Sequence, residues 1–167
     1  SDPVPTKYGN KDGHAIYYEA KVFDGEPRAE TGSTVRSGAK AMLKRGRIQS
    51  YYFADDYMVA KQFVGNHGPV VLGVDWYEQM NFPNNRHIIR PLGKRVGGHC
   101  LLWVGIRGPY ALLRNSWGSD YGASGTVSIL ENDLMGLFAA NGEACAAVEA
   151  PAQSQSLFQK FTRLFHR

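Results

Sequence analysis

The sequence predicts an α+β fold, with helices in its first half and a mostly antiparallel sheet in its second. Between residues 14 and 66, apolar positions recur with the helical period. From Gly68 onward the apolar residues come in runs of strand length, and two of these runs are joined by a short turn containing Gly108-Pro109. A helical half followed by hairpin-connected strands is typical of an α+β domain.

Four helices are expected from the periodic segments. The first is closed by Asp24-Gly25, and the second is capped by Ser33 or Thr34 and stopped by Gly46. The predicted helices are His14–Phe23, the residues between Thr34 and Gly46, the residues between Asp56 and Gly65, and Glu131–Ala140. The residues expected to face inward from the second and third helices are Val35, Ala39, Met42, Leu43, Val59, Ala60, Phe63 and Val64.

Four strands follow from the apolar runs. The first of them, Val70–Val74, is continuously apolar, which is typical of a strand covered on both faces. The others are Leu101–Ile106, Ala111–Asn115 and Thr126–Ile129, and Arg107–Tyr110 forms the hairpin turn between two of them. Cys100 lies inside an apolar run, where a free cysteine is expected to be a small buried residue.

Composition sets bounds on function. The chain has 167 residues, 43% hydrophobic residues and a net charge of +4, which is ordinary for one globular domain. Its basic residues are scattered and accompany no nucleic-acid motif, so no nucleic-acid partner is expected. The two cysteines give no disulfide framework, and the lone histidines His67 and His87 have no ligand cluster around them, so neither a metal nor a cofactor is expected. No signal peptide is recognised, and no apolar run is long enough to span a membrane.

The organisation along the chain is predicted in three parts. Residues 1–13 form an extended N-terminal arm, residues 14–150 the main domain, and residues 151–167 a linker followed by an amphipathic helix. The apolar stripe of that helix is Leu157, Phe158, Phe161, Leu164 and Phe165. This helix either packs on its own domain or binds a protein partner or a second copy of the chain; attachment to a membrane surface is the least favoured alternative.

The most informative motif is Gly97-Gly98-His99 on a predicted strand, followed sixteen residues after His99 by Asn115-Ser116-Trp117-Gly118 on the next. This order predicts a histidine general base, His99, oriented by Asn115 and covered by Trp117. Such a pair is the base half of a cysteine-histidine-asparagine catalytic site. Residues 1–99 contain no cysteine. Cys100 directly follows His99 on the strand and is expected to point to the opposite face, and Cys145 has no base near it in sequence.

These motifs resemble the papain family of cysteine peptidases. The segments Gly97–His99, Asn115–Gly118 and Gly68–Val74 are similar to the family's His strand, Asn-Ser-Trp-Gly segment and Gly-Pro-Val strand, and Tyr121 stands in an aromatic slot. Closer still is the similarity to compact papain-like proteins of bacteriophages and bacteria, through Thr31–Gly46, Asp75-Trp76-Tyr77 and Asp133-Leu134. The resemblance covers roughly residues 15–148. It implies a papain-like fold, in which Asp75-Trp76-Tyr77 either line a cleft or only pack.

The sequence departs from the family at the nucleophile. The family carries a Gln and then the nucleophilic Cys on a helix that precedes the matched region, and the chain is expected to begin after that helix. We therefore expect a papain-like pseudopeptidase that serves as a binding or structural module, with a bacteriophage particle as one setting. In that setting, the protein would be made in the host cytoplasm and then carried in the virion. The alternative is the C-terminal part of an active peptidase whose Cys-bearing segment has been removed or belongs to another chain.

Overall fold

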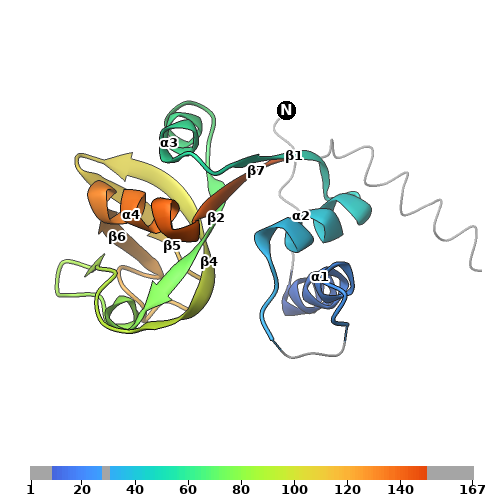
Figure 1. Cartoon of the computed structure of the whole chain (residues 1–167), viewed down its shortest axis with the longest axis horizontal. Helices are drawn as coiled ribbons and strands as arrows, with labels where there is room; N and C mark the ends of the chain where they lie inside the picture. The colour runs from blue at the N-terminus through green and yellow to red at the C-terminus, as the bar shows by residue number, and fades with distance from the viewer. Residues whose placement is uncertain (1–8, 28–30, 150–167) are drawn as a thin grey trace, which may run out of the picture. The chain divides into compact units, whose positions relative to one another are not determined.

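The structure is a computed structural model that describes residues 9–27 and 31–149 (Figure 1). The helices are α1 (Asn10–Phe23), α2 (Val35–Lys44), α3 (Tyr57–Asn66) and α4 (Glu131–Asn141), with one 3-10 turn, η1 (Glu78–Asn81). The strands are β1 (Ile48–Ala54), β2 (Val70–Tyr77), β3 (Ile88–Ile89), β4 (Arg95–Arg107), β5 (Tyr110–Arg114), β6 (Thr126–Leu130) and β7 (Glu143–Glu149). None of the helices within these ranges is long and apolar enough to cross a membrane.

The chain forms two compact units. Of the described residues, those up to 51 and those from 147 to 149 belong to the first unit, and residues 52–146 form the second. In the first unit, α1 and α2 pack against each other, and ion pairs connect their polar sides. The Glu19 carboxylate of α1 accepts from Arg45 Nε at 2.6 Å and lies 2.7 Å from Lys44 Nζ. A pair of short helices buries little apolar surface. Ion pairs therefore contribute more to fixing the arrangement of α1 and α2 than they would in a larger core.

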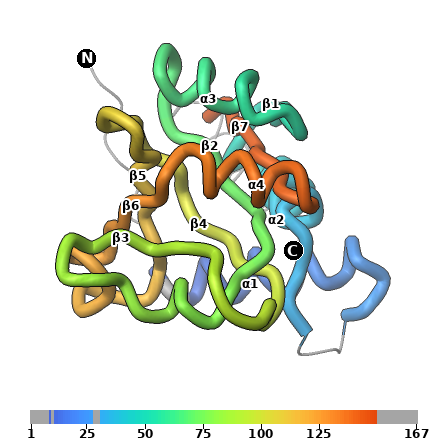
Figure 2. Tube along the Cα trace, turned by 60° about the vertical axis from the view of Figure 1, so that its left-hand side comes forward, coloured from blue at the N-terminus to red at the C-terminus, as the bar shows by residue number. Residues whose placement is uncertain are grey.

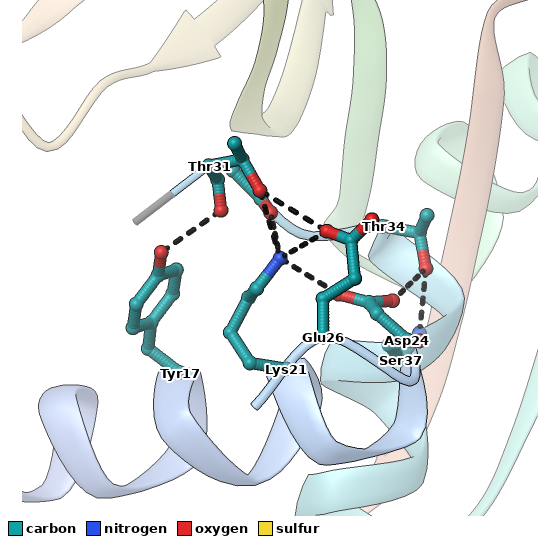
Figure 3. Close-up of polar contacts among 8 residues, drawn as sticks. Tyr17, Lys21, Asp24, Glu26, Thr31, Thr34 and Ser37 are labelled. Atoms are coloured by element: carbon teal, nitrogen blue, oxygen red, sulfur yellow. Dashed lines mark hydrogen bonds and ion pairs between the residues drawn. The ribbon is translucent and has the colours of Figure 1, made fainter. Parts of the chain in front are cut away.

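A buried lysine organises the connection between α1 and α2. Lys21 is only 1% exposed, and its ammonium group donates to Glu26 Oε2 at 3.1 Å, Thr31 Oγ1 at 3.0 Å and the Gly32 carbonyl at 3.0 Å (Figure 3). These three acceptors match the three protons of an ammonium group, so the buried charge is fully hydrogen-bonded. One side chain of α1 thereby binds both ends of the loop that leads to α2.

Most of the sheet belongs to the second unit, where Figure 2 traces β2, β4, β5 and β6. The seven strands are hydrogen-bonded in the order β1-β7-β2-β4-β5-β6-β3. The pairs β2–β7, β2–β4, β4–β5 and β5–β6 are antiparallel, and β3–β6 is parallel. The turn at Gly108-Pro109 places Arg107 opposite Tyr110, as predicted, and Gly108 takes the positive φ of +56° that such a tight hairpin requires.

Two helices cover the face of the sheet that carries the core. From α3 come Tyr57, Ala60 and Val64, and from α4 come Leu134, Leu137 and Phe138. Tyr57 stacks on the fully buried Trp103 of β4 at 5.6 Å between ring centroids, and Phe138 meets Tyr57 edge-on at 5.8 Å. These contacts join α3, α4 and β4 in a single core.

The predicted fold class is confirmed: the chain is α+β with a mostly antiparallel sheet. Two residues that were expected to face inward are exposed instead. Val59 is 56% exposed because the buried stripe of α3 runs through Tyr57, Ala60 and Val64 instead. Leu43 is 39% exposed, since α2 buries its small residues Ser37, Ala39 and Ala41.

Several element boundaries also differ. Helix α1 begins at Asn10, so residues 10–13 are helical rather than part of an extended arm; the Gly9 amide donates to Asp12 Oδ2 at 3.1 Å and starts the helix earlier. Strands β1, β3 and β7 were not expected. The alternation in β1 is interrupted by polar residues, and β7 (EACAAVE) is rich in alanine, which has low strand propensity. The predicted domain boundaries stay predictions, and the tail stripe lies outside the described residues.

We predict that Lys21→Met destabilises the chain by about 1–3 kcal/mol, because the loop between α1 and α2 loses three hydrogen bonds to a charged donor. Denaturant unfolding followed by circular dichroism measures the change. Lys11→Met is the matched control, since Lys11 is exposed on the same helix. Equal stability of both variants would contradict the structural role of Lys21.

Candidate catalytic site

The register of three strands places His99 beside Asn115. In the β2–β4 pair, His99 lies opposite Val74, and in the β4–β5 pair, Leu102 lies opposite Arg114. Asn115 follows β5 directly, because the strand ends at Arg114, one residue earlier than expected. Continuing the register brings Asn115 diagonally across from His99 on the same face, a spacing at which side chains interact.

A hydrogen bond joins the two side chains. His99 Nε2 lies 3.0 Å from Asn115 Oδ1, so the prediction that the pair lies within hydrogen-bonding reach is confirmed. The same oxygen accepts the backbone N–H of Ser116 at 2.8 Å, which identifies this amide atom as the acceptor. Since Oδ1 can only accept, His99 Nε2 must carry a proton. Neutral His99 therefore has a bare Nδ1, and among the described residues no hydrogen bond reaches that atom.

The asparagine is fixed from its backbone as well. Asn115 is 6% exposed, and its backbone N–H donates to the Gly125 carbonyl at 2.8 Å. Gly125 in turn donates its N–H to the Tyr121 carbonyl at 2.8 Å, which closes the loop between β5 and β6. Gly125 has a φ of +83°, and a Cβ there would lie 3.0 Å from the Gly118 carbonyl oxygen, so the closed loop requires glycine at this position.

Two tryptophans contact the imidazole, and their rings also meet each other edge-on at 5.4 Å between centroids. Trp117 lies 4.7 Å from the His99 ring and Trp76 lies 4.6 Å from it, measured between ring centroids. Trp76 is 3% exposed and donates its indole N–H to Asn81 Oδ1 at 2.8 Å, whereas Trp117 is 44% exposed and forms the outer cover. The expected cover by Trp117 is therefore present. The sequence left open whether Trp76 packs or lines a cleft, and the structure places it against the candidate base. Trp76 is two residues after Val74 and so on the same face of β2 as the partner of His99, which is the pattern that could have predicted this contact.

Neither cysteine lies on the face of the sheet that carries His99. In the strand pairing, Cys100 is opposite Gly73 and Cys145 is opposite Val71. Gly73 and Val71 lie an odd number of residues from Val74, the partner of His99, so they belong to the other face of the sheet. Cys100 is exposed, not buried as expected, because that face of β4 has a less complete cover. Although it lies at the surface, the protein atoms around its thiol and the Glu143 carboxylate raise the pKa of Cys100.

Other predicted features stay separate from this site. Within residues 9–27 and 31–149, no group of three or more His, Cys, Asp and Glu side chains could hold a metal ion. Asp75, next to Trp76, points to the other face, where Arg95 lies 2.7 Å away and holds the pKa of the Asp75 carboxyl below its usual range. The stripe Leu157, Phe158, Phe161, Leu164 and Phe165 is not among the described residues.

Comparison with known proteins supports one family. No protein-family model matches the sequence. A cathepsin B-like cysteine proteinase of Schistosoma japonicum is 33% identical over 84 residues, which cover 46% of this chain and 24% of the relative. The match thus spans about a quarter of that relative's length.

Solved structures share the fold. Xylellain, a cysteine protease from Xylella fastidiosa, matches with a TM-score of 0.65 at 18% identity, over 82% of this chain and 69% of its own. The bromelain protease from Ananas comosus in complex with the inhibitor E64 matches with a TM-score of 0.57 at 12% identity, over 71% of this chain and 70% of its own. The chain therefore has the papain-like fold, and the sequence match supports a relationship with the papain-like cysteine proteases.

We predict that alkylation of Cys100 by iodoacetamide at neutral pH is slower than that of a free cysteine and is unchanged in His99→Ala. The raised pKa of Cys100 keeps its thiolate fraction low, and the sheet separates its sulfur from the imidazole. Mass spectrometry of the labelled peptide measures the rate, and Cys100→Ser assigns the site. Labelling that is fast and depends on His99 would show that the two side chains form a reactive pair.

Proposed function

We propose that this chain supplies the base half of a papain-like cysteine peptidase site. The observation that carries the proposal is the orientation of His99, whose Nε2–H is bound by Asn115 Oδ1 while Nδ1 is left bare. A base that is oriented through one nitrogen and open at the other fits a site in which a nucleophile approaches the open side. Trp76 and Trp117 support this role because they limit the access of water to the imidazole.

The proposed reaction divides the proton transfers as follows. A cysteine thiolate attacks the carbonyl carbon of a peptide bond, and the His99 imidazolium gives its Nδ1 proton to the leaving amine nitrogen as the C–N bond breaks. Neutral His99 then takes a proton from water as the water oxygen attacks the thioester, which releases the acid and the thiolate. Asn115 holds the ring through both steps, because its oxygen accepts from Nε2–H in either protonation state.

The thiolate in this proposal comes from outside the 167 residues, either from another part of the same protein or from another chain. Cys100 and Cys145 project from the face of the sheet opposite His99, which argues against both as nucleophiles. That same observation favours a second candidate function: a pseudopeptidase that uses the fold as a binding or structural module, with a bacteriophage particle as one setting. The two candidates differ only in whether a thiol meets His99 Nδ1.

Peptidase assays separate the two candidates. The 167-residue chain alone is expected to hydrolyse no fluorogenic peptide. The product of the complete natural reading frame is expected to hydrolyse such peptides, and His99→Ala should lower its kcat/KM by about 10²–10⁴-fold. His14→Ala is the matched control, since His14 is exposed on α1. A folded full-length product that is inactive with an intact His99 would favour the pseudopeptidase.

For the tail, we propose that the stripe formed by Leu157, Phe158, Phe161, Leu164 and Phe165 binds a protein partner or a second copy of the chain. On the helix that the sequence predicts, five large apolar side chains would fall on one side, and monomeric proteins generally avoid leaving such a patch in water. Burial of each such side chain contributes roughly 1.5–3 kcal/mol, so the stripe could supply a micromolar interaction after ordering costs.

Deleting residues 152–167 should abolish concentration-dependent association in analytical ultracentrifugation and leave the melting temperature unchanged. Phe161→Ser should act like the deletion, whereas Gln159→Ser, on the polar side of the same helix, should have no effect. A large loss of monomer stability with unchanged association would mean that the tail packs on its own domain.

A further inference from the structure

The short turn η1 supplies a hydrogen-bond acceptor to one of the tryptophans beside His99. Its last residue is Asn81, and the Oδ1 atom of Asn81 accepts the indole N–H of Trp76 at 2.8 Å. An indole N–H can only donate, so the oxygen of the amide must face Trp76. The Trp76 ring lies 4.6 Å from the imidazole between centroids, at an interplanar angle of 58°. One side chain thus connects Asn81 to the candidate base.

The turn that carries Asn81 is itself fixed. Met80 is fully buried, and its carbonyl accepts the hydroxyl of Tyr121 at 2.6 Å. At the start of η1, the Glu78 backbone N–H donates to the Lys94 carbonyl, and the Lys94 N–H donates to Glu78 Oε2, both at 3.0 Å. Lys94 directly precedes β4, the strand that carries the candidate base. The position of Asn81 is therefore set by hydrogen bonds that do not involve its own side chain.

Burial makes the acceptor necessary. Trp76 is 3% exposed, and a buried N–H without a partner loses the hydrogen bond that it would form with water. Turning the indole over about its Cβ–Cγ bond would direct the N–H away from Asn81 and break the bond between them. The hydrogen bond therefore selects one orientation of the indole and, with it, the part of the ring that contacts His99.

The imidazole requires this second constraint. Asn115 Oδ1 lies 3.0 Å from His99 Nε2, which fixes one atom of the ring. The χ2 torsion of histidine has broad preferences, so one hydrogen bond leaves the tilt of the ring plane open. Packing against Trp76 limits that tilt. The tilt in turn decides where the bare Nδ1 points.

We infer that Asn81 is a positioning residue for His99 and acts through Trp76. It fixes the indole, and the indole holds the plane of the imidazole so that Nδ1 faces one direction. The role of Asn81 in catalysis rests on the proposed function, whereas its effect on the geometry of the imidazole does not.

The test is nuclear magnetic resonance on the 167-residue chain with Asn81→Leu, which keeps the approximate size of the side chain and removes the acceptor. Solvent exchange of the Trp76 indole proton should become about fivefold faster, as expected for the loss of one hydrogen bond. The ring protons of His99 should change chemical shift, because their shifts depend on the orientation of the neighbouring indole. Asn81→Asp keeps an acceptor oxygen at the same place and should leave both signals close to those of the unchanged chain.

Asn84→Ala is the matched structural control. Asn84 Oδ1 accepts the backbone N–H groups of Arg86 at 2.9 Å and Ile88 at 3.0 Å, so this variant loses two hydrogen bonds in the loop after η1 and none to Trp76. It should lower the melting temperature without moving either signal. If Asn81→Leu behaves in the same way, or if Asn81→Asp behaves like Asn81→Leu, the inference is overturned. If Asn81→Leu fails to fold, Asn81→Ser decides by the same criteria, because its shorter side chain withdraws the acceptor from the indole.

Activity separates this inference from the proposed function. In an active full-length product, Asn81→Leu should lower kcat about two- to fivefold and leave KM nearly unchanged, because Asn81 acts on the direction of Nδ1 and not on substrate binding. Asn81→Asp should restore kcat. An inactive product would refute the proposed function, and the two resonance signals would still decide the geometry. A loss of activity in His99→Ala beside an unchanged kcat in Asn81→Leu would refute the role of Asn81 alone.

Discussion

The hydrogen bond between His99 and Asn115 is the interaction on which the candidate site depends. It forms because β2, β4 and β5 pair in a register that brings both residues to one face. Successive residues of a strand alternate between faces, so a slip of one residue in β4 would turn His99 to the other face and bring Cys100 into its place. The buried residues Leu101 and Trp103 of β4 oppose such a slip, since it would turn them to the more exposed face of the strand. The register that buries the core residues of β4 therefore also fixes the face on which His99 lies.

The environment of the pair suits a base more than an ordinary buried histidine. Trp76 is buried and donates to Asn81, Trp117 is partly exposed, and the two rings contact both the imidazole and each other. The ring is therefore shielded without being sealed, and Nδ1 is left unbonded among the described residues. A histidine kept only for stability would be expected to bond through both nitrogens. The open Nδ1 is the feature that the proposed base function requires.

The core of the site could be predicted from the sequence because it is local. His99, the Gly108-Pro109 turn and Asn115 lie on one hairpin, so strand alternation and a two-residue turn are sufficient to align them. Trp76 belongs to another strand, and its contact with His99 depends on the β2–β4 register, which no local pattern specifies. The hydrogen bond between Tyr121 and Met80 joins residues 41 positions apart, and no local pattern predicts it either.

Elements outside the hairpin were harder for physical reasons. Strand β7 is mostly alanine and glutamate and gains its conformation from pairing with β2, not from its own propensity. The burial of Lys21 depends on three acceptors in a loop that has no periodic pattern. The exposure of Cys100 depends on which face of β4 is left uncovered, and an apolar sequence run does not reveal this.

The most direct test of the central claim is the tautomer of His99 in the unmodified chain, measured by nitrogen-15 correlation spectroscopy above the pH at which the ring is neutral. The structure predicts that Nε2 carries the proton and that Nδ1 gives the signal of an unprotonated nitrogen, because Asn115 Oδ1 accepts at Nε2. A proton on Nδ1, or rapid averaging between the two nitrogens, would show that Asn115 does not orient the ring, and the site would then not be the base half of a peptidase.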